Sequence, residues 1–265
     1  MDINGYYIGP DKEEDLRSAN FAGADLGNVD LSYYDLSNAN LFGANLAYAN
    51  LSSTNLSNAD LTGAVLTGAD LTGTNLYNAI FVKANLECCN LSNSFVRHVA
   101  PFNSGVWRFS ETRENWRPLG TTPVAFPPEE PIGFRWRPLD GKNVYLSIEG
   151  PDFSYANLAQ AKLTGSKLYK SRFLFASLSG ACFIGGEFID SNFFGATIFG
   201  SDFSEAKLNF SDMSKAKMNG ALLIAADLTN VNFTGANLQG ADLSGAAITG
   251  TVFTDAELTR TKMPK

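Results

Sequence analysis

The 265-residue sequence has a single histidine, His98, and only three cysteines. One histidine cannot build a histidine-rich metal site, and its scarcity removes the commonest general acid–base group from most candidate active sites. Two of the cysteines, Cys88 and Cys89, are adjacent, and an odd number with a neighbouring pair makes a poor disulfide framework. The composition therefore predicts a cytoplasmic protein without disulfides, bound metal, cofactor or catalytic activity.

The sequence also lacks basic character and long apolar runs. Twenty Lys and Arg against 27 Asp and Glu give a net charge of -7, whereas contacts to phosphates require a basic surface. No window approaches 18 consecutive apolar residues, and the acidic N-terminus does not resemble a secretion signal. We therefore expect no direct nucleic-acid binding and no membrane association.

What the sequence has in abundance is a five-residue repeat. Every fifth residue from Leu16 to Val96, and again from Phe153 to Met263, is apolar. We call this residue the centre of its pentapeptide. Five residues advance an α-helix by roughly 500°, so these centres would not form a stripe on a helix. In an extended strand, residues i and i+5 lie on opposite faces. The chain must therefore turn within every pentapeptide if each centre is to point inward.

Other positions of the repeat support this interpretation. The residue two before the centre is small and fits a second inward position, while Gly or Asn recurs two after the centre, as expected for a corner. Five of the eight central phenylalanines of the second run are spaced by 20 residues or multiples of 20, which predicts four pentapeptides per coil; they are Phe153, Phe173, Phe193, Phe233 and Phe253. An outward column of alternating charge is interpreted as a structural ladder; it comprises Lys167, Glu187, Lys207 and Asp227.

Units such as Ala24-Asp25-Leu26-Gly27-Asn28 and Ala59-Asp60-Leu61-Thr62-Gly63 match the A(D/N)LXX consensus. On these units the sequence resembles the pentapeptide repeat family over about 200 residues. The resemblance implies an all-β fold, a right-handed quadrilateral β-helix. It implies less about function, because members of the family differ. The best-understood bacterial members resemble duplex DNA and bind DNA gyrase, whereas a cyanobacterial subset is linked to developmental signalling.

The repeat is interrupted between Val96 and Phe153, where the step from one centre to the next is not a multiple of five. We therefore predict two solenoid segments, residues 15–97 and 151–265, separated by an irregular insert at residues 98–150. Residues 1–14 are expected to form an N-terminal cap, which is helical if Asp11 is its N-cap. A cap is needed because the open end of a solenoid presents unpaired strand edges.

The insert holds all three tryptophans and is rich in arginine and proline. One interpretation is that the tryptophans fold back on the solenoid as a satellite core, because large apolar side chains usually bury. The other is a protein-binding surface, because Trp and Arg are enriched in interface hot spots. The candidate partner-binding residues are Trp107, Arg108, Trp116, Arg117, Trp136 and Arg137.

Two functions follow from these patterns. The first is a non-catalytic interaction or scaffold protein that binds an unidentified protein through the solenoid faces and the insert. The alternative is a DNA-mimicking regulator of a topoisomerase or another DNA-binding protein, and its acidic surface would comprise Asp15, Asp25, Asp30, Asp35, Asp60 and Asp70. Duplex DNA presents about 12 negative charges over ~20 Å, whereas residues 15–96 carry a net charge of -5. Charge density therefore favours the first function.

The C-terminal end raises the question of oligomeric state. The repeat runs in frame through Phe253, Leu258 and Met263, and no cap is recognisable after them. A final coil would expose an apolar cross-section and unpaired backbone groups. Two arrangements would cover this end: a homodimer through the C-terminal coils, with an isologous contact that closes around a two-fold axis, or a last coil that bends inward and caps itself.

Overall fold

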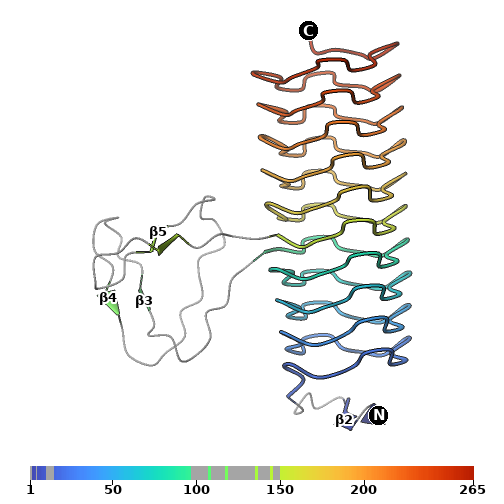
Figure 1. Cartoon of the computed structure of the whole chain (residues 1–265), viewed down its shortest axis with the longest axis vertical. Coiled ribbons are helices and arrows are strands. Elements are labelled where there is room, and N and C mark those ends of the chain that lie inside the picture. Colours follow the sequence, from blue (N-terminus) through green and yellow to red (C-terminus); the bar gives the residue numbers. More distant parts are fainter. Residues whose placement is uncertain are drawn as a thin grey trace. The chain divides into compact units, whose positions relative to one another are not determined.

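The structure is a computed structural model that describes residues 2–3, 5–9, 15–96, 107–108, 117–118, 135–136, 144–145 and 150–265. The chain divides into two compact units. Met1–Val96 and Glu149–Lys265 together form the solenoid, which is the column of stacked coils in Figure 1. The other unit, here called the insert unit, is Arg97–Ile148.

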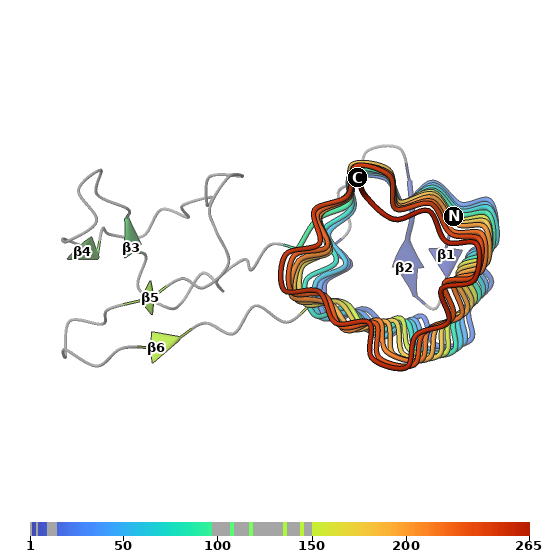
Figure 2. The ribbon, with the colours of Figure 1, turned by 90° about the horizontal axis from the view of Figure 1, so that it is seen from above.

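The solenoid is a ladder of parallel β-bridges between residues 20 apart, such as Asn40 with Asp60 and Arg172 with Asn192. This spacing confirms the prediction of four pentapeptides per coil. Viewed along the column, the coils superpose on a four-sided ring (Figure 2). The predicted charge column is also found, because Glu187 bridges both Lys167 and Lys207, and the Lys207 Nζ lies 3.1 Å from the Glu187 Oε1.

The pentapeptide 60–64 shows why each position of the repeat has its residue type. The Asp60 Oδ1 accepts a hydrogen bond from the Thr62 N–H at 2.9 Å, so the carboxylate stabilises the turn that follows it. Leu61 is fully buried, and Gly63 takes a φ of 69° at the corner. The Ala64 N–H donates to the Leu61 carbonyl at 3.0 Å, which closes the turn and returns the chain toward the interior. Each consensus pentapeptide therefore forms one side and one corner of a coil.

The solenoid interior is filled by one large and one small side chain from each side. The predicted phenylalanine column is fully buried at Phe153, Phe173 and Phe193, and consecutive rings stack with centroids 5.0 and 4.6 Å apart. Where the small position carries a hydroxyl, that group donates to the backbone, as the Thr54 Oγ1 does to the Leu31 carbonyl at 2.8 Å. The buried hydroxyls at the small positions are thereby satisfied without breaking the apolar core, whereas the buried Ser154 Oγ, which lies outside these positions, has no hydrogen-bond partner among the described residues.

The two runs of repeats form a single continuous ladder, a point that the sequence pattern left open. Ile80 bridges Asp152, and Phe95 bridges Lys167. The sequence separation within each of these pairs equals one coil plus the whole insert unit, Arg97–Ile148. The rings of Phe81 and Phe153 stack across the junction with centroids 4.8 Å apart. The solenoid therefore continues as if the insert unit were absent.

Gly150 lies where the chain re-enters the ladder. It is buried, and a Cβ at this position would lie 2.2 Å from the Tyr169 carbonyl oxygen and 2.6 Å from the Ser171 nitrogen. Because both neighbours are backbone atoms of the next coil, only glycine fits. The junction thus has a steric requirement that the five-residue pattern alone does not indicate.

The N-terminal end is covered by a β-hairpin that the sequence did not predict. Strands β1 (Asp2–Ile3) and β2 (Tyr6–Tyr7) pair antiparallel, and β2 crosses the ring of the solenoid in Figure 2. The Tyr6 ring lies 5.1 Å from that of Phe21, and Ile8 is buried. The hairpin therefore caps the first coil, while the helix expected from Asp11 falls on residues 10–14, outside the described residues.

The described part of the insert unit consists of two short ladders. Strand β3 (Trp107–Arg108) pairs antiparallel with β4 (Arg117–Pro118), and β5 (Arg135–Trp136) pairs antiparallel with β6 (Val144–Tyr145). Each ladder spans two residues per strand.

Deletion of Arg97–Ile148 should leave a folded solenoid, because Val96 would then be followed by Glu149 and Gly150 in the frame of the repeat. Closing a loop of about 50 residues costs roughly 2 kcal/mol more than closing one of about four residues. We therefore expect the deletion variant to unfold at an equal or higher temperature than the intact chain, as measured by circular dichroism.

The matched control is deletion of Arg97–Gly150, which removes the junction glycine and shifts the frame of the repeat. This variant should lose stability. Aggregation or a lower melting temperature of the in-frame deletion would instead support a satellite core between the tryptophans and the solenoid.

Candidate interaction surfaces

The corners of the solenoid carry a set of exposed aromatic side chains. The residue two after each centre has a positive φ, and five of these residues are Tyr or Phe with φ between 54° and 65°. They are 48–75% exposed and comprise Tyr33, Tyr48, Tyr155, Phe175 and Phe210. A left-handed backbone costs a residue with a side chain about 1–2 kcal/mol. The expectation of Gly or Asn at the corners missed these rings, although a large residue at a corner position is visible in the sequence.

Two of the exposed rings, Tyr155 and Phe175, lie in contact along one corner of the solenoid, and the half-buried Phe194 ring adjoins them. The Tyr155 and Phe175 rings stack with centroids 5.4 Å apart, and the Phe194 ring meets that of Phe175 edge-on at 5.4 Å. The Lys215 Nζ lies 5.4 Å from the centroid of the Phe194 ring, a cation–π contact. Lys83 precedes Tyr155 at the same corner, one coil below. We call Lys83, Tyr155, Phe175, Phe194 and Lys215 the corner ridge.

A glycine at the same corner of the next coil makes room for the Phe175 ring. A Cβ on Gly195 would lie 2.6 Å from the Cε1 of Phe175. The same arrangement occurs at another corner, where a Cβ on Gly68 would lie 2.6 Å from the Cε1 of Tyr48. Each ring is thus held against a backbone surface, which restricts its rotation.

The Trp and Arg candidates of the insert lie only partly within the described residues. Trp107 and Arg108 form β3, Arg117 lies in β4, and Trp136 lies in β5. The backbone register places Arg108 opposite Arg117. Trp116 and Arg137 fall outside the described residues.

The six predicted acidic residues are spread around the solenoid, and each is used in a turn. Asp60, Asp25 and Asp30 lie in three different bridge columns, and Asp35 lies in the fourth. In every case the Oδ1 accepts a hydrogen bond from the backbone N–H two residues later; the acceptors are Asp15, Asp25, Asp30, Asp35, Asp60 and Asp70. The repeat itself therefore accounts for their presence.

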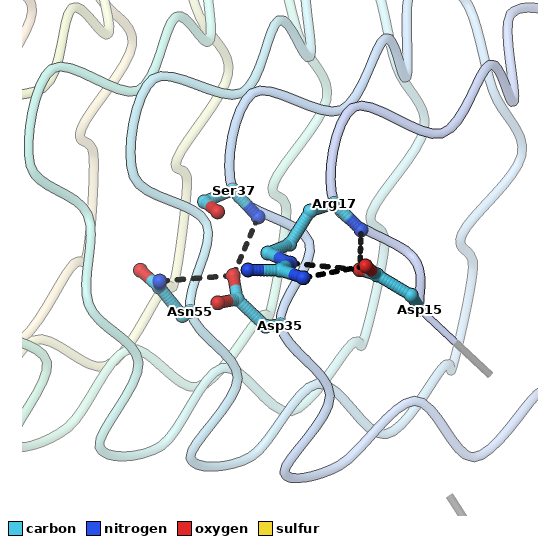
Figure 3. Close-up of polar contacts among 5 residues, drawn as sticks. All are labelled: Asp15, Arg17, Asp35, Ser37 and Asn55. Atoms are coloured by element: carbon cyan, nitrogen blue, oxygen red, sulfur yellow. Dashed lines mark hydrogen bonds and ion pairs between the residues drawn. The ribbon is translucent and has the colours of Figure 1, made fainter. Parts of the chain in front are cut away.

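Arg17 further reduces the negative charge near the N-terminal end. Its Nη2 lies 2.6 Å from the Asp15 Oδ2, and its Nε donates to the Asp15 Oδ1 at 2.8 Å. Figure 3 shows the guanidinium between the carboxylates of Asp15 and Asp35. Asp35 in turn accepts hydrogen bonds from the Ser37 N–H at 2.9 Å and the Asn55 Nδ2 at 3.0 Å. The hydrogen bonds from Arg17 lower the pKa of Asp15 to about 2.

Among the residues that the structure describes, neither a metal-binding group of side chains nor a membrane-spanning helix is found. Within the described ranges, no group of three or more His, Cys, Asp or Glu side chains could hold a metal ion. The same part of the chain contains no helix that is long and apolar enough to span a bilayer. Of the cysteines, Cys88 is exposed, while Cys89 is buried at a small inward position and burial raises its pKa.

Substitution of Arg17 with Gln should raise the pKa of Asp15 from about 2 toward its ordinary value of 3.8, because the guanidinium hydrogen bonds and charge are lost, while the backbone N–H of residue 17 still donates. A carboxylate with a lowered pKa stabilises the folded state above its unfolded pKa, and this contribution disappears as the pH falls toward 2. Carboxyl 13C NMR titration would measure the change. Substitution of Arg260 with Gln in the last coil is the control, and an unchanged Asp15 titration in R17Q would contradict the pairing.

The contact between Phe175 and Gly195 can be tested by comparing two glycine substitutions. Gly195 and Gly220 both have a positive φ, but a Cβ on Gly220 would meet no atom within 4 Å. Both G195A and G220A should lose about 1–2 kcal/mol to backbone strain. Only G195A must also displace the Phe175 ring, so it should be the less stable variant in urea denaturation. Equal losses would show that the ring is not held by the glycine.

Comparison with known proteins places this geometry in a family. The family model for pentapeptide repeats matches in eight copies, over residues 19–58, 35–73, 59–96, 152–185, 187–223 and 226–263. No functionally curated protein matches the sequence.

Several solved structures resemble the chain. HetL, a pentapeptide repeat protein involved in heterocyst differentiation regulation from the cyanobacterium Nostoc sp. strain PCC 7120, is 24% identical with a TM-score of 0.46, over 92% of this chain and 89% of HetL. Full-length QnrB1, a plasmid-mediated fluoroquinolone resistance protein, is 13% identical with a TM-score of 0.37, over 90% of each chain. Rfr23 from the cyanobacterium Cyanothece 51142 is 22% identical with a TM-score of 0.34, over 68% of this chain and 87% of Rfr23.

These likenesses are too distant to transfer a function, since all three TM-scores lie below 0.5. The family model, in contrast, covers most of the chain, and its copies coincide with the ladder of bridges on both sides of the insert unit. This protein belongs to the pentapeptide repeat family.

Proposed function

We propose that the chain is a non-catalytic, cytoplasmic interaction or scaffold protein that binds another protein through the insert unit and the faces of the solenoid. The observation that supports this most directly is the continuity of the ladder across the junction, from Ile80 to Asp152 and from Phe95 to Lys167. Because no coil needs the insert unit for completion, the fold of the solenoid gives no reason for its presence.

The composition of the insert unit supports a binding role. It holds all three tryptophans and six of the nine arginines of the chain. Trp and Arg are the residue types that most often dominate the free energy of protein binding, because they combine large contact areas with directional hydrogen bonds. A segment that leaves a rigid ladder and returns to it at adjacent positions is well placed to present such residues.

The alternative, DNA mimicry toward a topoisomerase or another DNA-binding protein, has less support. The net charge of -5 over residues 15–96 is under half the density of duplex DNA. The carboxylates are engaged in turns, and Asp15 is paired with Arg17. A partner that recognises the phosphate pattern would meet an incomplete set of charges.

Replacement of Trp116, Arg117, Trp136 and Arg137 by alanine tests the proposal. Quantitative mass spectrometry of proteins captured by the intact chain and by this variant should show at least a tenfold loss of specific partners, while the solenoid melts at the same temperature. A matched control replaces Thr121 and Thr122 of the same segment and should retain capture.

The salt dependence of capture separates the two functions. Mimicry of phosphates would weaken steeply as ionic strength rises, whereas a contact centred on tryptophan would not. Unchanged capture by the quadruple variant, combined with steep salt sensitivity, would favour mimicry over the proposed function.

The homodimer through the C-terminal coils stays a prediction. Sedimentation equilibrium at micromolar concentration should give a dimer that L258K disrupts. A monomer of 28.5 kDa would contradict it.

A further inference from the structure

The corner ridge combines exposure with a backbone strain that the coil does not require. Tyr155 is 57% exposed and Phe175 48% exposed, with φ values of 60° and 54°. Other coils place glycine at the same corner, for example Gly63 and Gly235, with φ values of 69° and 64°. Since glycine takes this conformation without strain, the fold gains nothing from an aromatic residue there. The same left-handed φ occurs at 23 non-glycine residues of the described chain, so the stacked pair of exposed rings, and not the strain, distinguishes this corner.

Within the described part of the solenoid, the two lysines of the ridge, like Lys162 and Lys217, make no ion pair with a carboxylate. Lys170, Arg172, Lys207 and Lys262 each lie within 4.0 Å of a carboxylate oxygen. Among the described residues, no carboxylate pairs with the lysines at the ridge ends. The ridge is therefore an apolar strip with an unneutralised positive charge at each end.

On this basis, and resting on the proposed interaction function, we propose that the corner ridge binds an extended segment of a partner protein that carries apolar side chains between two carboxylates. Lys83 and Lys215 are four coil steps apart, or about 19 Å at ~4.8 Å per step. An extended chain rises about 3.3 Å per residue, so the carboxylates should be about six residues apart. The partner's apolar side chains would contact the rings of Tyr155, Phe175 and Phe194, and its carboxylates would pair with the two lysines.

A defined peptide tests this proposal directly. The probe is fluorescein-labelled Glu-Gly-Phe-Gly-Phe-Gly-Glu, and two matched probes replace both Glu by Lys or both Phe by Ser. Fluorescence anisotropy with the full chain should show binding of the first probe at least tenfold tighter than that of either matched probe. Equal binding of all three probes, or no binding at millimolar concentration, would overturn the proposal.

Variants of the chain locate the binding to the ridge. Lys83→Glu combined with Lys215→Glu should reverse the preference, so that the Lys probe binds about tenfold more tightly than the Glu probe. Phe175→Ser should abolish binding, and G195A, which displaces the same ring, should weaken it. Tyr48→Ser is the matched control, because Tyr48 is an exposed ring that lies on a glycine at a corner without lysines, and its loss should change nothing.

The deletion variant lacking Arg97–Ile148 distinguishes failure of this inference from failure of the proposed function. If the ridge is the site, the deletion variant binds the Glu probe as the full chain does. Binding that disappears with the deletion and ignores the ridge variants would assign the acidic segment to the insert unit, which overturns the ridge and leaves the interaction function standing. Failure of the interaction function itself would appear in the capture experiment with the quadruple variant.

Discussion

The path of every coil and the stacking of its side chains depend on the parallel hydrogen-bonded ladder between residues 20 apart. Because each coil must present its N–H and C=O groups to the next at about 4.8 Å, every coil repeats the path of its neighbour. A side chain therefore meets its own counterpart one coil above and below. The stacked Phe173 and Phe193 rings, the alternating column through Glu187 and the hydrogen bond from the Asn55 Nδ2 to the Asp35 Oδ1 are three results of this single constraint.

The same constraint explains why so much of the fold could be predicted from the sequence. A ladder with a fixed period translates directly into sequence spacing, so the phenylalanines at 153, 173 and 193 revealed the number of sides. The features that were missed are those outside the period. The hairpin of β1 and β2 has only two residues per strand and no repeat. The requirement at Gly150 arises from backbone atoms of the next coil, which no local pattern records.

The candidate surfaces were less predictable than the fold, for a related reason. Outward positions are not constrained by the core, so Tyr155 and Phe175 are visible as large residues at corner positions, but the five-residue pattern does not say what they contact. Their meaning depends on which residues share a corner, and the junction places Lys83 and Tyr155 on adjacent coils although the whole insert unit separates them in the sequence. The acidic residues show the opposite case, in which a conspicuous charge pattern serves the turns of the repeat.

At the junction, the ladder of the solenoid is continuous although the insert unit interrupts the sequence of repeats. Four bridges join the coils on either side of it, from Ile80 with Asp152 to Phe95 with Lys167, and the Phe81 and Phe153 rings stack between them. A peptide bond cut anywhere within Arg97–Ile148 would divide the chain into two pieces whose contact is a complete turn of the ladder. The solenoid would then persist as a noncovalent complex of two fragments, each ending in its own half of the insert unit.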